Sequence, residues 1–177
     1  MKRYGLWLAI FLIFSSCSLK YDQGHNVEST VPEFSFSDVV FSRYEDKKIA
    51  MKMEAGQLEQ YKDGASTFGK DVSFAVYEDG EIVTEGVCSY LGMDTKKEVY
   101  ELFENIRIHN KKQNLEVTGK KFRWNGKNEQ LTSGRNDMVK IEKDGMTIHG
   151  SGFSASGVSS SFSFNSIVTG TIETKDE

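Results

Sequence analysis

Residues 139–148, VKIEKDGMTI, contain the pattern that decides the fold. Apolar side chains occupy every second position from Val139 to Ile141 and again from Met146 to Ile148. This period of two is typical of a β-strand with one buried and one solvent-facing side. Asp144-Gly145 stands between the two runs and is a hairpin signal, because the favoured two-residue turns need positive φ at their central residues. The stretch therefore predicts two antiparallel strands joined by a tight turn.

The same alternation recurs through most of the chain after Glu33. It is found in five further runs, at residues 49–53, 72–76, 106–108, 115–117 and 122–124. Three further hairpin signals lie between runs, at Asp63-Gly64, Asp79-Gly80 and Asn125-Gly126. Residues 95–103 are the one stretch with helical spacing, but this stretch is short and leads into the run at Ile106, so we expect strand or loop there. The sequence predicts an all-β protein.

The predicted strands follow one another in a repeating order. Residues 50–86 run parallel to residues 114–150 at an offset of about 64, and a shorter element at 36–39, 103–106 and 164–167 precedes or follows each unit. A repeated strand unit predicts an elongated sheet sandwich that grows by stacking and has free edges at both ends. The alternative is that any meander of hairpins looks similar to itself.

The N-terminus has the layout of an export signal. Lys2 and Arg3 precede an apolar run at residues 6–14, and Ser15-Ser16-Cys17 follows, as in a secretory signal peptide. The small residues before Cys17 resemble the lipobox of bacterial lipoproteins, which predicts lipidation of Cys17. An uncleaved membrane anchor and plain secretion remain alternatives, although sixteen uncharged residues between Arg3 and Lys20 are short of the ~20 apolar residues of a spanning helix.

Four segments follow from this pattern. We expect a signal peptide or short anchor at 1–16, a lipidated Cys17 with a tether at 17–33, one β-domain at 34–173 and a tail at 174–177. Residues 18–31 are polar and aperiodic and lead to Pro32, the single proline. As a random coil they would give the domain a reach of about 20 Å. After lipidation of Cys17, Cys88 would be the one remaining cysteine, so the fold cannot depend on an internal disulfide.

Composition and motifs exclude several classes of function. The chain has 177 residues, one domain's worth, and a net charge of -4 with 26 acidic and 22 basic residues, which argues against nucleic acid as a partner. The three histidines have no ligand spacing, so we expect no metal site and no cofactor. No nucleophile elbow or phosphate-binding loop occurs, and the carboxylates sit mainly in turns or on polar strand faces. We therefore expect a protein that is not an enzyme.

Several of these elements together resemble the LptC family of lipopolysaccharide-export proteins and, more distantly, LptA/OstA-like proteins. The resemblance rests on Asp38-Val39 and Asn105-Ile106, on strands ending in small residues at Ala55-Gly56 and Gly119, and on Leu58, Tyr61, Phe122 and Trp124 after them. It covers residues 34–173. The resemblance implies an elongated open β-jellyroll, a twisted two-sheet sandwich whose dry interior holds acyl chains.

The resemblance also implies partners and a location. The chain would receive lipopolysaccharide or a related glycolipid from an inner-membrane LptBFG-type ABC transporter and pass it to an LptA-like periplasmic protein. It would sit on the periplasmic face of the inner membrane, held by its N-terminal lipid or anchor, or at the outer membrane if Cys17 is lipidated. The alternative function is that of a β-rich structural or adhesive lipoprotein.

Two sets of residues are candidates for the site. The apolar positions of the alternating strands are candidates for a lipid-binding groove: Met51, Met53, Phe74, Val76, Ile106, Ile108, Leu115, Val117, Phe122, Trp124, Val139, Ile141 and Ile148. They could equally fill a closed core, since periodicity does not separate a core from a groove. The resemblance implies edge strands that pair with neighbouring proteins, at residues 34–41 with Phe36, Val39 and Phe41, and at residues 158–172 with Phe162, Phe164 and Ile167. The alternative for the C-terminal stretch is a flexible low-complexity tail, because residues 151–166 contain eight serines.

Overall fold

The computed structural model describes residues 31–61, 66–157, 161–166 and 168–172, and every regular element in these ranges is a strand. The strands are β1 Phe34–Glu45, β2 Lys48–Gln60, β3 Ser66–Glu78, β4 Glu81–Asp94, β5 Val99–Asn110, β6 Leu115–Asn125, β7 Gln130–Ser133, β8 Met138–Lys143, β9 Met146–Ser151, β10 Phe153–Ser156, β11 Ser161–Phe164 and β12 Thr169–Ile172. All pair antiparallel. The predicted all-β fold is confirmed.

Each long strand turns a corner near its middle. The pairing of β1 with β2 skips Asp38 and Gly56, that of β3 with β4 skips Asp71 and Ser89, and that of β5 with β6 is irregular at residues 104–105. Asp38, Asp71, Glu104 and Asn105 have positive φ. In β1–β4 one residue is skipped on both paired strands and the register is kept, whereas at the β5 corner the register shifts, as at a β-bulge. An extra residue of this kind bends a strand and changes which face its side chains take. We call this row of positions the corner line.

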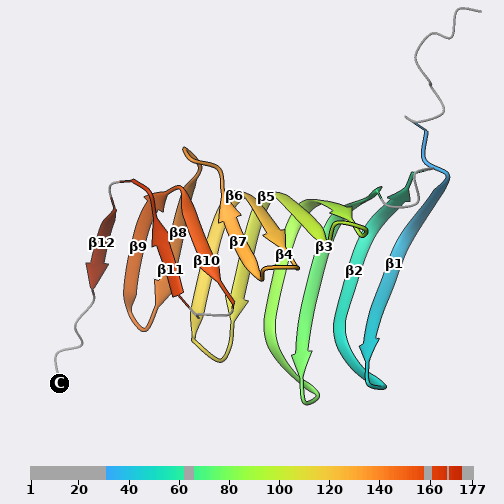
Figure 1. Cartoon of the computed structure of the whole chain (residues 1–177), viewed down its shortest axis with the longest axis horizontal. Helices are drawn as coiled ribbons and strands as arrows, with labels where there is room; N and C mark the ends of the chain where they lie inside the picture. Colours follow the sequence, from blue (N-terminus) through green and yellow to red (C-terminus); the bar gives the residue numbers. More distant parts are fainter. Residues whose placement is uncertain (1–30, 62–65, 158–160, 167, 173–177) are drawn as a thin grey trace, which may run out of the picture.

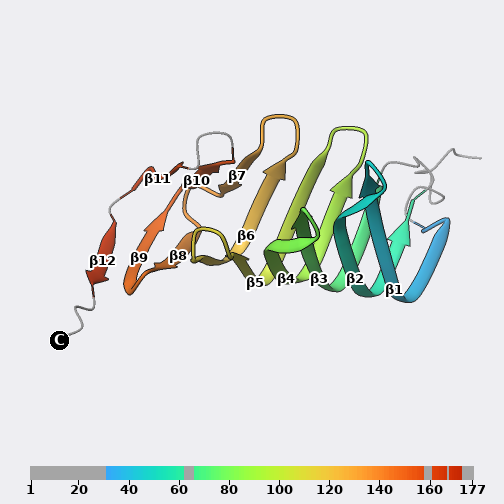
Figure 2. The ribbon, with the colours of Figure 1, turned by 90° about the horizontal axis from the view of Figure 1, so that it is seen from below.

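The corner line divides the sheet into two arms that face each other. The first arm contains the beginning of β1, and its strand order ends β6-β7-β10-β11; the second arm contains the end of β1 and ends β6-β8-β9-β12. Beyond β6 the arms are separate, because β7 and β8 pair with different halves of β6. Figures 1 and 2 show the resulting elongated ribbon, with β1 and β12 at opposite ends. This is the open, unclosed β-jellyroll that the sequence predicted.

Turn chemistry accounts for the hairpins. Asp79-Gly80 and Asp144-Gly145 have positive φ at both residues and join β3 to β4 and β8 to β9, as predicted. Asp46-Lys47 forms a similar turn without glycine. Asn125-Gly126 instead opens a four-residue loop that ends at Glu129 with positive φ, because β6 extends to Asn125. Asp63-Gly64 lies outside the described residues.

The repeat of about 64 residues has a structural counterpart. Shifted by this offset, β1 falls on β5 and β2 falls on β6, while β3, β4 and β5 each fall on a pair of short strands (β7 with β8, β9 with β10, β11 with β12). The second copy therefore repeats the first with its strands cut at the corner line. Cutting the strands is what frees the two arms from each other at the C-terminal end of the molecule.

Candidate functional site

The inner face of the folded sheet is a continuous apolar surface. One row of directly opposed residues crosses nine strands of the second arm: Phe41, Met53, Phe74, Gly86, Ile108, Val117, Ile141, Ile148 and Gly170. A parallel row crosses seven strands of the first arm: Phe36, Leu58, Gly69, Leu91, Leu102, Phe122 and Ser133. Neither row contains a charged residue. Cross-strand neighbours of this kind contact one another, so each row forms one apolar strip.

The corner line keeps apolar side chains on the inner face of both arms. In β3 the buried positions are Thr67 and Gly69 before the corner and Val72 after it, so the spacing changes from two residues to three. Gly119 and Phe122 in β6 show the same spacing of three. Without this extra residue at the corner, a strand with a strict period of two would point its apolar side chains inward in one arm and outward in the other.

All thirteen predicted groove residues lie on this inner face, but their burial differs. Six are buried: Met53, Ile106, Val117, Phe122, Val139 and Ile141. Four are partly buried and pack against that core: Phe74, Ile108, Leu115 and Ile148. The remaining three, Met51, Val76 and Trp124, have intermediate exposure. The structure thus brings the predicted set together, and whether it binds lipid stays a prediction.

Inner-face residues were also missed by the sequence reading. Ala55, Leu58, Val72, Cys88, Leu91, Met93, Tyr100, Leu102, Leu131, Phe153 and Ala155 belong to the same cluster. Leu58, Leu91 and Phe153 each lie three residues after an inward position on the other side of a corner. A search that allowed a spacing of three at the corners would have identified them. Cys88 is buried, and burial raises the pKa of its thiol to about 11, so the thiol stays protonated at neutral pH and acts as a small apolar side chain.

The two ends of the inner face differ. At the C-terminal end, the Phe153 ring contacts those of Phe122 (centroids 5.9 Å apart), Phe162 (6.3 Å) and Phe164 (5.5 Å). The ring of Phe164, from β11 of the first arm, reaches the second arm, where a Cβ on Gly150 would lie 2.6 Å from its Cδ1 atom. Aromatic rings therefore fill the space between the arms at this end.

At the β1 end the inner side chains are exposed. Phe34, Phe36 and Phe41 are 51%, 49% and 47% exposed, and Phe34 stacks on Phe36 with ring centroids 6.2 Å apart. Large apolar side chains exposed together mark an interaction site. Phe36, Val39 and Phe41, predicted as partner-edge residues, all lie on this strand.

The predicted C-terminal edge differs from the single strand expected at 158–172. Residues 161–164 form β11, which pairs with β10, and residues 169–172 form β12, which pairs with β9. A hydrogen bond from Asn165 N to Gly152 O and contacts between Ser151 and Ser166 hold the connection beside the corner line. Each arm thus has its own edge strand, because the arms are already separate. Phe162 and Phe164 lie on β11, the edge strand of the first arm, and their side chains pack against the inner cluster. Ile167 is outside the described residues.

Charged side chains gather on the outer face. Arg107 pairs with Glu116 and Lys111 with Glu85. Arg107, Glu116 and Glu85 border a shallow outer hollow of about 470 Å³ over Ser73 and Ala75. Among the residues described, no group of three or more His, Cys, Asp or Glu side chains could hold a metal ion. Nor does that part of the chain contain a helix long and apolar enough to cross a membrane. Cys17 and the rest of the predicted export segment lie outside the described residues.

An open, two-armed β-sheet with an apolar inner face and edge strands at both ends defines a class of elongated β-jellyroll proteins. The family model described as "Lipopolysaccharide-assembly, LptC-related" matches residues 6–173. The chain belongs to this LptC-related family, which confirms the resemblance seen in the sequence. The chain is also similar to an uncharacterized protein of Treponema pallidum (strain Nichols), 24% identical over 139 residues that span 77% of this chain and 70% of that protein.

Family membership gives a general function. It supports a role in lipopolysaccharide transport and association with the cell envelope. The family consists of transport-bridge proteins rather than enzymes.

Proposed function

We propose that the chain is the membrane-tethered periplasmic component of a lipopolysaccharide export bridge and binds acyl chains between its two arms. The chain would receive lipopolysaccharide or a related glycolipid from an inner-membrane LptBFG-type ABC transporter at β1. It would pass the lipid to an LptA-like protein at the β11 and β12 edges. A lipid on Cys17 or an N-terminal anchor holds it at the periplasmic face of the inner membrane, or at the outer membrane if that lipid directs it there.

The observation that carries this proposal is the uncharged inner row across nine strands, with its exposed aromatic residue, Phe41, at β1. At a strand spacing of about 4.8 Å the row is roughly 38 Å wide. An acyl chain of about 14 carbons crossing water would expose CH₂ groups worth about 0.8 kcal/mol each, or roughly 10 kcal/mol in all. An apolar strip that leads from one protein to the next removes most of that barrier.

The edges support the direction of transfer. Among the strands that the structure describes, β1 pairs with β2 alone, so its other edge is available for strand addition. The rings of Phe153 and Phe164 fill the interior at the opposite end, so passage of an acyl chain there requires the arms to part. The separation of the arms beyond β6 makes such parting possible without breaking a shared strand.

Photo-crosslinking tests this proposal. A photo-reactive amino acid at Phe74 or Val117, on the inner face, should capture glycolipid in energised membranes. The matched controls are Ser73 and Glu116, the neighbours in sequence, whose side chains face the outer hollow. Labelling at Ser73 and Glu116 equal to that at Phe74 and Val117 would count against an inner-face lipid path.

Partner binding at the C-terminal end needs a separate variant. Deleting residues 168–177 removes β12, whose residues are all exposed, and leaves Phe162 and Phe164 in place. We expect this deletion to reduce capture of the LptA-like partner while the urea unfolding midpoint stays unchanged. Capture at the parental level would contradict the assignment of β12 as a partner edge.

A second function, a β-rich structural or adhesive lipoprotein, is favoured by one specific observation. Phe122 and Ile141 have exposures of 0%, as in the closed core of a scaffold. The crosslinking experiment separates the two functions, because a scaffold captures no glycolipid at any inner position.

A further inference from the structure

The outer face of the first arm carries exposed aromatic residues between lysines. Lys70, Tyr90, Phe103 and Lys121 stand directly opposite one another on β3, β4, β5 and β6. Phe68 lies in the neighbouring row of β3, opposite Gly92. Phe68 and Tyr90 are 52% and 51% exposed. We call Tyr61, Phe68, Lys70, Tyr90, Phe103 and Lys121 the aromatic patch.

Two pairs of side chains in the patch contact each other. The rings of Tyr61 and Phe68 meet edge to face with centroids 5.5 Å apart. The ammonium of Lys121 lies 5.1 Å from the centroid of Phe103. The Phe68 ring lies against Gly92, where its Cε1 would be 3.6 Å, an ordinary contact distance, from an added Cβ. The patch is therefore an ordered apolar surface rather than a set of scattered side chains.

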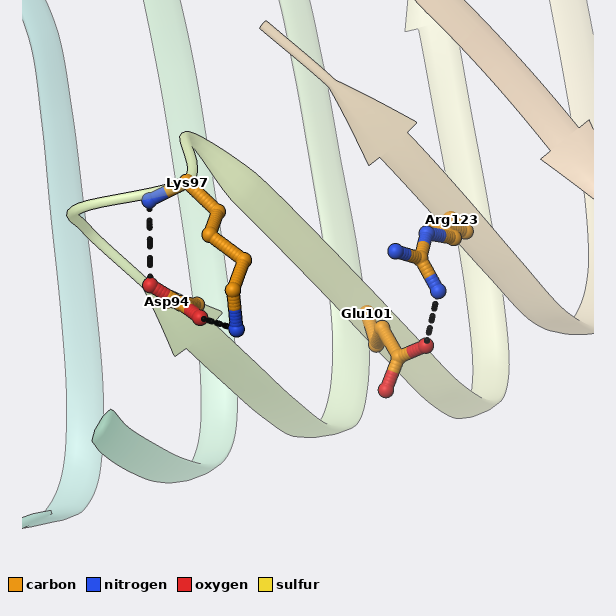
Figure 3. Close-up of polar contacts among 4 residues, drawn as sticks. All are labelled: Asp94, Lys97, Glu101 and Arg123. Atoms are coloured by element: carbon orange, nitrogen blue, oxygen red, sulfur yellow. Dashed lines mark hydrogen bonds and ion pairs between the residues drawn. The ribbon is translucent and has the colours of Figure 1, made fainter. Parts of the chain in front are cut away.

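The charges around the patch leave its lysines available. Glu101 is paired with Arg123 at 3.4 Å (Figure 3), and Glu59 accepts hydrogen bonds from Gln57 and Tyr61. Within the described ranges, neither Lys70 nor Lys121 forms an ion pair with a carboxylate. The nearby acids Asp71 and Glu104 lie on the corner line, at the margin of the patch.

The described chain begins beside this patch. Glu33 N donates a hydrogen bond of 2.7 Å to Gln60 O, next to Tyr61, and β1 starts in the first arm, as Figure 1 shows. Ser35 is opposite Glu59, and Glu59 is opposite Phe68, so the start of β1 is two strand spacings, or about 10 Å, from Phe68. Any attachment of residues 1–17 to a membrane therefore tethers the domain next to the patch.

We infer that the aromatic patch rests on the bilayer surface, with Phe68 and Tyr90 among the headgroups and Lys70 and Lys121 on anionic lipid phosphates. Aromatic residues prefer the membrane interface, and lysines reach from an apolar surface to the headgroups. Because both lysines would pair with lipid phosphates, the patch would prefer a membrane that contains anionic lipid. The sixteen residues between Cys17 and Phe34 span at most about 60 Å, so the tether keeps the patch at high effective concentration near the bilayer and a weak contact suffices.

This docking would fix the orientation of the domain. With the outer face of the first arm on the membrane, its inner face points away from the bilayer and the second arm lies above it on the periplasmic side. The inference rests on the N-terminal membrane attachment in the proposed function, and its experiment separates the two.

The experiment uses the full-length exported protein in vesicles of phosphatidylethanolamine and phosphatidylglycerol with brominated acyl chains. Bromine quenches tryptophan fluorescence at short range. Phe68→Trp and Tyr90→Trp place a probe in the patch, and Val87→Trp is the matched control, because Val87 is 45% exposed on the outer face of the second arm. The parent chain gives the background from Trp124 and, where residues 1–16 are kept as an anchor, from Trp7, and urea midpoints verify that each variant folds.

We expect at least twofold stronger quenching at positions 68 and 90 than at position 87. We also expect the double variant Lys70→Gln with Lys121→Gln to lower that quenching about twofold in anionic vesicles and to leave it unchanged in phosphatidylcholine. Quenching at positions 68 and 90 equal to that at position 87 would overturn the inference. A blue-shifted emission without quenching would also overturn it, since it would show that a protein or a sugar covers the patch instead of lipid. Failure of the parent chain to float with the vesicles would instead refute the membrane attachment itself.

Discussion

Phe122 and Phe68 provide a matched pair for testing how the inner face is packed. Phe122 in β6 is 0% exposed, whereas Phe68 in β3 is 52% exposed. The Phe122 ring meets Phe153 edge to face, with centroids 5.9 Å apart and an interplanar angle of 79°. It also covers Gly119, whose Cβ, if present, would lie 2.9 Å from the ring. Phe122→Ala therefore opens a cavity between the arms, while Phe68→Ala opens none.

The magnitudes follow from this difference. Replacing a fully buried phenylalanine with alanine lowers the free energy of unfolding by about 3–5 kcal/mol, and an exposed substitution changes it by roughly 1 kcal/mol or less. With an m-value of about 2 kcal/mol/M in urea, we expect the unfolding midpoint to fall by roughly 1.5–2.5 M for Phe122→Ala. The expected fall for Phe68→Ala is about 0.5 M or less.

The assay is urea unfolding followed by far-ultraviolet circular dichroism, with the parent chain alongside. Equal m-values for the three proteins would show that the midpoint shifts report stability. A shift for Phe122→Ala no larger than that for Phe68→Ala would refute the conclusion that the C-terminal half of the inner face is a packed core. It would indicate an interior already open to water.

Three further outcomes follow from the structure. Gly86→Val should lower the unfolding midpoint, because its Cβ would lie 2.4 Å from Cζ of Phe74 and overpacking costs about 1–3 kcal/mol; the change Phe74→Leu should restore part of the loss, and a double variant no better than Gly86→Val would contradict the contact. Cys88 should react with a thiol reagent at pH 7.5 only after unfolding, because burial raises the pKa of its thiol to about 11; rapid labelling of the native protein would show the opposite. Asp94→Asn should lower stability at pH 7 but not at acidic pH: hydrogen bonds from Lys97 lower the pKa of the Asp94 carboxyl (Figure 3), so its contribution is present above the unfolded pKa and is lost as pH falls through the folded pKa. An equal loss at both pH values, measured by urea unfolding, would exclude this ionic role.

The sequence predicted where strands occur better than it predicted how the long strands continue across their corners. Period-two alternation located the runs in β2, β3, β5, β6, β8 and β9, and the Asp-Gly turns at residues 79–80 and 144–145 were found correctly. Leu58, Leu91 and Phe153 were missed because each follows a corner, where inward positions are three residues apart rather than two. Asp46-Lys47 was missed because it adopts positive φ without glycine.

The aromatic patch had no sequence signal. Lys70, Tyr90, Phe103 and Lys121 are distant in the chain and come together only through the register of four strands. Likewise, alternation placed Phe122 and Phe74 in one set of apolar positions, but Phe122 is buried and Phe74 is only partly buried, and this difference depends on which part of the arms faces each. Local patterns set the face of a strand, and the arrangement of the arms sets the exposure.

The corner line also determines which changes of length the protein tolerates. In β1–β4 each corner shifts the phase of its strand by one residue, and the paired strands make the same shift at the same height. In β5 the inward residues Leu102 and Ile106 lie four apart, and the pairing register shifts there. Removing Asp71 would restore a strict period of two in β3 and turn Thr67 and Gly69 outward against partners still in the old phase. Adding one residue to the loop at residues 95–98 would not change which side chains of the neighbouring strands face inward. Insertions and deletions should therefore be confined to the loops at the rims of the arms, and the distance from rim to corner should stay constant among relatives.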